Sequence, residues 1–132
     1  MMSRYSILKK VGFWNEEIFL DLADWDICWR LMDSGYICVR TCKVTLSHTV
    51  GEGERGVLFL RIRNGAPLRV YYQTLNYLIL LFKSYTPFRF RLFFLRNLIF
   101  KPWFSFILLD RKRERLGYYF KGIRDYFKLL NK

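Results

Sequence analysis

Three prolines limit the secondary structure that the second half of this chain can adopt. All three lie in that half, at Pro67, Pro87 and Pro102. Proline has no backbone N–H, so it suits the first turn of a helix and disrupts a helix interior. We therefore expect one helix from Pro67 to about Ser84, a break at 85–87, a second helix that ends at Pro102, and less regular helix over the rest.

Charge is divided between the two halves of the 132 residues. Residues 1–56 hold 7 Lys and Arg against 8 Asp and Glu, a net of −1, whereas residues 57–132 hold 16 against 3, a net of +13. In the segment 88–101, arginines alternate with phenylalanines and leucines instead of forming one polar face. This pattern is typical of a helix in a membrane interface, where Arg and Lys side chains reach toward lipid head groups. We expect basic, aromatic-rich amphipathic helices over 67–132.

The first half begins with helical spacing. Within residues 20–36, apolar residues recur at i, i+3, i+4 and i+7, which predicts a buried helix face made of Trp25, Cys28, Trp29 and Met32. Asp24 is expected to be the N-cap, and Asp26 and Arg30 to form an i, i+4 ion pair on another face. Ser34-Gly35 predicts the end of the helix.

Two short strands and a glycine loop are expected next. Residues 36–39 and 43–48 have strand-like composition, and three glycines between 51 and 56 predict a mobile loop. We divide the chain into a first domain, 1–56, a flexible linker, 57–66, and the helical part, 67–132.

Several classes of protein are disfavoured. The three cysteines lack Cys-x-x-Cys spacing, which argues against a disulfide framework and a zinc ribbon and suggests a reducing cytoplasm. No secretion signal is recognised, and no apolar window reaches the length of a membrane-spanning helix. The chain is also short for an enzyme that holds both a nucleotide-sugar and an acceptor, so we expect it to be part of a larger catalytic unit.

An ordered set of residues surrounds the acidic cluster. It comprises Gly12, Trp14, Asn15, Glu16, Ile18, Phe19, Leu20, Asp21, Asp24, Asp26, Arg30, Gly35 and Tyr36. A second set comprises His48, Gly51, Arg69, Tyr71, Tyr72 and Asn76. In order and spacing these residues resemble glycosyltransferase family 2 enzymes of the rhamnosyltransferase type. The resemblance is good over about residues 5–85 and looser in the tail. Trp14 and Asn15 stand where Phe and Asp are commoner, and Asp26 stands where Glu is frequent.

The resemblance implies a fold and a reaction. The fold is α/β, a partial GT-A-type, Rossmann-like first part followed by an α-helical part on the membrane surface. The reaction is an inverting transfer of a sugar from a nucleotide-sugar to a lipid-linked or cell-surface polysaccharide acceptor, at the cytoplasmic face of the bacterial inner membrane. The family's N-terminal half, which binds the donor and carries an Asp-x-Asp metal motif, is not in this sequence, so the chain alone is expected to be inactive.

The resemblance also assigns roles to residues. Asp24 corresponds to the catalytic base; its other interpretation is helix capping. Asp21 is expected to bind acceptor hydroxyls or to fix the loop. Asp26 with Arg30 is expected to shape the acceptor pocket or to be a structural ion pair.

Two further residues are assigned to the donor side. His48 corresponds to a ligand of a divalent Mn or Mg ion that is completed by acidic residues absent from this chain, and its alternative role is packing. Arg69 opens the first helix of the second half, where it is expected to bind a diphosphate or phosphate, or to extend toward head groups like other helical arginines.

Two other functions compete with sugar transfer. A non-enzymatic membrane-surface module, or a gene remnant, would need only residues 67–132 and would leave the acidic cluster unexplained. A nucleic-acid binder would account for the net charge of +12 and the aromatic content. However, the basic residues alternate with apolar ones in buried-looking helices, and no nucleic-acid motif is present, so we expect no nucleic-acid partner.

Overall fold

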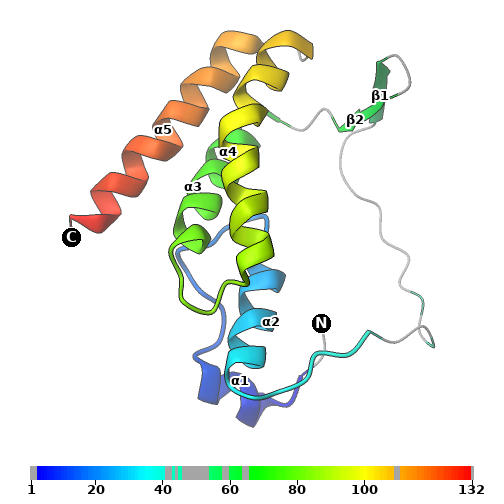
Figure 1. Cartoon of the computed structure of the whole chain (residues 1–132), viewed down its shortest axis with the longest axis vertical. Helices are drawn as coiled ribbons and strands as arrows, with labels where there is room; N and C mark the ends of the chain where they lie inside the picture. Colours follow the sequence, from blue (N-terminus) through cyan, green and yellow to red (C-terminus); the bar gives the residue numbers. More distant parts are fainter. Residues whose placement is uncertain are drawn as a thin grey trace.

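The chain is helical apart from one hairpin in the part that the structure describes (Figure 1). The computed structural model describes residues 3–40, 43, 45, 54–57, 60–63, 66–108 and 111–131. In order, its elements are α1 (Tyr5–Val11), α2 (Ala23–Asp33), β1 (Glu54–Val57), β2 (Leu60–Arg63), α3 (Pro67–Leu81), α4 (Phe88–Leu108) and α5 (Lys112–Leu130).

The expected α/β, Rossmann-like first part is wrong. Residues 36–40 form no strand, and in the described part of the chain the one sheet is the antiparallel pair β1–β2, which joins Glu54 to Arg63 and Val57 to Leu60. This hairpin occupies part of the expected glycine loop and linker. A run of four strand-like residues specifies a strand only if a neighbour accepts its backbone hydrogen bonds, and no described strand lies beside 36–40. Most of the second expected strand, 43–48, lies outside the described residues.

The helix boundaries of the second half follow the prolines in two of three places. Pro67 is the first residue of α3, and the break before α4 ends at Pro87, as predicted. Pro102, however, lies inside α4. A helical proline cannot donate to the carbonyl four residues earlier, which here belongs to Leu98. The Tyr119 hydroxyl of α5 donates to that carbonyl at 2.7 Å, so the proline is tolerated.

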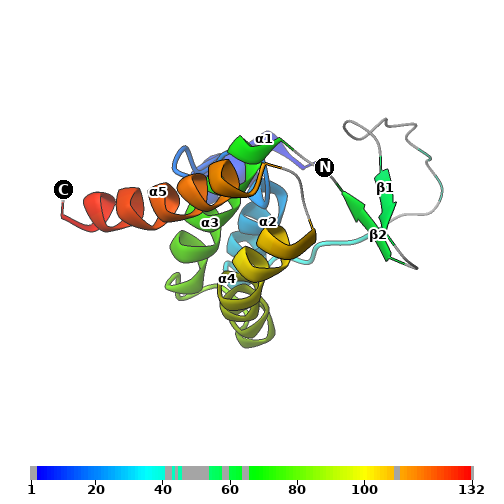
Figure 2. The ribbon, with the colours of Figure 1, turned by 90° about the horizontal axis from the view of Figure 1, so that it is seen from above.

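The core lies among α3, α4 and α5, with a contribution from the first half. Its buried residues are Ile18, Trp29, Leu75, Tyr77, Ile79, Leu80, Phe94, Leu98 and Tyr126. The rings of Tyr77 and Phe94 are stacked with centroids 5.1 Å apart. Gly122 lets α5 approach α3 closely, because a Cβ at this position would lie 3.0 Å from the Thr74 Cβ and the Tyr71 carbonyl. Helix α3 packs against α5 and α4, and Figure 2 shows the hairpin to one side of the helices.

Helix α2 is present but turned relative to the expected orientation. Its buried residues are Asp26, Ile27, Trp29 and Leu31, whereas Trp25 and Met32 are 38% and 54% exposed. The buried Asp26 draws this face inward, because its carboxylate is bound by groups inside the fold. The predicted end at Ser34-Gly35 is confirmed, with Gly35 at φ 84°. None of the helices in the described segments combines the length and apolar character of a membrane span.

Candidate functional site

The loop that leads into α2 is attached to α3 through Asp21. Arg69 donates from Nε to Oδ2 of Asp21 at 2.8 Å and from Nη2 to Oδ1 at 2.6 Å. Gln73, one turn further along α3, donates to Oδ2 at 2.8 Å. Bidentate pairing of this kind fixes both the distance and the orientation of the carboxylate. Asp21 was expected either to bind acceptor hydroxyls or to fix the loop. In the structure its carboxylate fixes the loop to α3.

Lys101 of α4 closes this cluster from the other side. Its ammonium group donates to Oε1 of Gln73 and lies 5.5 Å from the centroid of the Tyr77 ring. Burial lowers the pKa of Lys101 to about 8, with Arg69 adding to the effect and Asp21 opposing it. Burial alone would raise the pKa of Asp21, but the hydrogen bonds from Arg69 and Gln73 and the nearby positive charges outweigh it and leave that pKa lowered.

Asn76 fixes the backbone of the same loop. It is fully buried, and its Nδ2 donates to the carbonyls of Phe19 and Asp21, both at 2.8 Å. Asn76 lies two turns of α3 beyond Arg69, so both side chains reach the loop from one face of the helix. Two side chains of α3 therefore position the residues immediately before Asp24.

A second cluster surrounds Asp26, which is 1% exposed. The expected pair with Arg30 is confirmed, with Nε 2.9 Å from Oδ2, but it lies inside the fold rather than on an outer face. The hydroxyl of Tyr85 donates to Oδ1 at 2.5 Å. Burial and the bond to Asp26 raise the pKa of Tyr85. Arg30 also donates to the carbonyls of Val11 and Phe13, at 2.6 and 2.5 Å, and so holds the chain after α1.

Asp24 differs from both of these aspartates. It is exposed, lies in the first turn of α2, and makes no hydrogen bond or ion pair with the residues that the structure describes. It is not the N-cap as predicted, because α2 begins at Ala23 and the cap position is Leu22. Backbone N–H groups and the helix dipole favour a carboxylate in this first turn. Asp24 therefore presents an ionisable group to solvent from a rigid support.

The metal prediction falls largely outside the described residues. His48 is not among them, so its role stays a prediction. Among the described residues, no group of three His, Cys, Asp or Glu side chains could hold a metal ion. These residues do not by themselves fit the divalent ion that the resemblance implies.

Sequence reasoning missed three of the side chains that build these clusters. Gln73, Tyr85 and Lys101 were assigned no role, although they bind Asp21 and Asp26 directly or through one another. Each lies in a stretch that reads as an amphipathic helix or a helix break. The acidic cluster was the one signal that could have pointed to these partners, because buried carboxylates in a folded domain require hydrogen-bond donors.

One curated protein shares sequence with most of this chain. The dTDP-rhamnosyl transferase RfbF of Shigella flexneri is 24% identical over 117 residues, which cover 89% of this chain and 38% of that protein. The chain thus spans well under half the length of this relative. No family model matches the chain. No solved structure matches it either. The similarity supports a glycosyltransferase-like assignment.

Proposed function

We propose that this chain supplies the acceptor side of an inverting glycosyltransferase and that donor binding requires a further part of the enzyme.

 It would transfer a sugar, rhamnose by similarity to the Shigella protein, from a nucleotide-sugar to a lipid-linked or cell-surface polysaccharide. The support is the similarity to a rhamnosyltransferase together with the arrangement of three aspartates.

The observation that carries this proposal is the different state of those aspartates. Asp21 and Asp26 are each bound by two side chains, and their partners tie the loop before α2 and the chain after α1 to the helical core. Asp24 lies between them and is exposed, with no partner among the described residues. A base must accept the proton of the acceptor hydroxyl as that oxygen attacks the anomeric carbon, so its carboxylate has to be accessible and ionised. Asp24 is exposed, and it lies in the first turn of α2, where the helix dipole favours a carboxylate.

The other predicted residues take supporting roles in this proposal. The polar groups of Asp21, Asp26 and Arg30 are bonded to other residues of the fold. In this proposal they position the base and the walls of the acceptor site and do not contact the sugar. The guanidinium of Arg69 is engaged with Asp21, so binding a diphosphate would require it to exchange partners. A divalent ion, with His48 as one ligand, would neutralise charge on the leaving diphosphate, and its remaining ligands would come from outside the described residues.

Two partners follow from the proposal. The first is a donor-binding half, because the chain matches only 38% of the Shigella protein. The second is the inner face of the bacterial membrane, because residues 57–132 carry a net charge of +13 and end in helices with exposed aromatic side chains.

The test uses a chimera in which this chain replaces the segment of the Shigella protein that it matches. Transfer of rhamnose from dTDP-rhamnose to acceptor is measured with and without Asp24→Asn. We expect the substitution to lower turnover about a hundredfold or more, because a general base contributes on that scale, and to leave donor binding unchanged.

Asp33→Asn is the matched control, since Asp33 is also an exposed aspartate of α2. It should leave transfer unchanged. Turnover of Asp24→Asn close to that of the unsubstituted chimera would refute the assignment of the base. A chimera that binds donor but transfers nothing while Asp24 is intact would count against the proposed function as a whole.

A further inference from the structure

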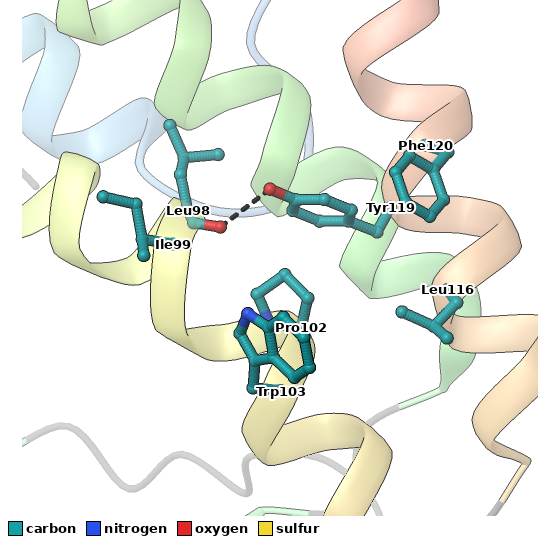
Figure 3. Close-up of a pocket in the computed structure, with 7 residues that line it drawn as sticks. All are labelled: Leu98, Ile99, Pro102, Trp103, Leu116, Tyr119 and Phe120. Atoms are coloured by element: carbon teal, nitrogen blue, oxygen red, sulfur yellow. Dashed lines mark hydrogen bonds between the residues drawn. The ribbon is translucent and has the colours of Figure 1, made fainter.

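An apolar groove lies between α4 and α5, away from the aspartates. Its volume is about 570 Å³, within the range of sites that bind small molecules. Figure 3 shows the side chains around it, which come from two helices: Ile99, Pro102 and Trp103 from α4, and Leu116, Tyr119 and Phe120 from α5. Aliphatic and aromatic carbon makes up nearly all of its wall.

The groove has few polar groups in its wall. The Tyr119 hydroxyl is the polar atom closest to its inner end, and it donates to the Leu98 carbonyl that Pro102 leaves without a helical donor (Figure 3). Apart from the indole N–H of Trp103, the groove wall therefore offers a ligand little that could replace the hydration of its polar atoms. A hydrocarbon chain matches this largely apolar wall.

The surroundings of the groove are basic. Arg96 precedes Ile99 by one helical turn, and Arg113 precedes Leu116 by one turn; both arginines are exposed. Over their whole lengths α4 and α5 carry ten Lys and Arg against two Asp and Glu. The net positive charge of the two helices would thus attract an anionic group attached to a hydrocarbon chain.

The rim is exposed in a way that suits a membrane surface. Trp103, Phe120 and Ile99 are 67%, 63% and 52% exposed although they line an apolar groove. Aromatic side chains flanked by arginines are favoured at the boundary between head groups and acyl chains. Further along α5, Phe127 and Leu130 continue the same exposed apolar stripe.

We propose that the groove between α4 and α5 binds one acyl chain of an anionic phospholipid, whose phosphate is attracted by the basic side chains of the two helices. This goes beyond attachment to a membrane surface by charge, because it assigns a defined hydrocarbon site to one lipid. It rests on the proposed membrane partner and is independent of the role of Asp24.

The experiment measures binding of monomeric lysophosphatidylglycerol to the full chain by calorimetry, below the concentration at which the lipid forms micelles. We expect saturable binding of one lipid per chain. Trp103→Gln and Phe120→Gln should each weaken it about tenfold, because each removes an apolar wall of the groove. Glycerophosphoglycerol, the head group without a chain, should show no comparable binding.

Phe88→Gln is the control, since Phe88 is a 71% exposed phenylalanine of α4 that does not line the groove. It should bind the lipid like the unsubstituted chain, and circular dichroism should show native helix content in all three variants. Equal affinity of the groove variants and the control would overturn the proposal, as would comparable binding of the head group alone.

Vesicle flotation separates this inference from the membrane proposal. If the chain floats with phosphatidylglycerol vesicles while the groove variants bind lysolipid normally, membrane attachment stands and the acyl-chain site is wrong. If the chain does not float with these vesicles and binds no lysolipid, both are wrong. A dimer that lysolipid does not dissociate would show that a second copy occupies the groove, which also refutes the proposal.

Discussion

Replacing Tyr119 by Phe should destabilise the chain through a single lost hydrogen bond. The substitution keeps the ring that packs between α4 and α5 and removes the hydroxyl that donates to the Leu98 carbonyl. Leu98 is 8% exposed, and Pro102 cannot supply the missing donor. A buried acceptor left without a partner costs about 1–3 kcal/mol, so the free energy of unfolding should fall by that amount.

Urea denaturation followed by circular dichroism measures this loss. With a slope of about 1–3 kcal/mol per molar urea, the midpoint should fall by roughly 1 M while the slope stays unchanged. Tyr118→Phe is the matched control, because Tyr118 is the neighbouring tyrosine and its hydroxyl has no hydrogen bond to the described residues. Its effect should be a few tenths of a kcal/mol, as for ordinary surface changes.

A double-mutant cycle with Pro102→Ala tests the stated cause. Alanine restores the N–H that can donate to the Leu98 carbonyl, so Tyr119→Phe should cost much less in the Pro102→Ala background than in the original chain. Equal costs in the two backgrounds would refute the reasoning, because the hydroxyl would then contribute independently of the proline.

Two further predictions concern buried polar groups. Because the pKa of Lys101 is lowered to about 8, the unfolded chain binds more protons than the folded one between about pH 8 and the ordinary lysine pKa, so the contribution of this residue to stability should rise with pH in that window. In melts across this range, the stability of the chain relative to Lys101→Met should rise with pH; a difference that does not change with pH would contradict the lowered pKa. Tyr85→Phe should cost about 1.5–3 kcal/mol in urea melts, since it removes a donor from the buried carboxylate of Asp26; a loss below half a kcal/mol would contradict that role.

Helix positions were predictable where local chemistry decides them. Pro67 and Ser34-Gly35 mark boundaries that the structure confirms, because both act within a single turn of helix. Pro102 was misread because the compensating donor, Tyr119, lies in another helix. The face of α2 was misread for a similar reason, since Tyr85 lies 59 residues beyond the Asp26 that it binds.

The candidate site was predictable only in its residue types. The acidic cluster and Arg69 were singled out from the sequence, but neither of the two roles expected for Arg69 included the bond that its guanidinium makes with Asp21. A pattern of charges specifies which groups must be satisfied without specifying their partners, because contacts between distant residues depend on the packing of whole helices. The distinction between a structural Asp26 and an exposed Asp24 required the fold.

The contact between Asp21 and Arg69 closes a loop of 48 residues. In the part of that loop whose side chains the structure describes, no residue after Leu31 and before α3 is buried. Lengthening a flexible loop whose ends are already joined costs little, about 0.6 kcal/mol for each doubling. Changes in length between α2 and α3 should therefore cost little stability and leave the support of Asp24 in place.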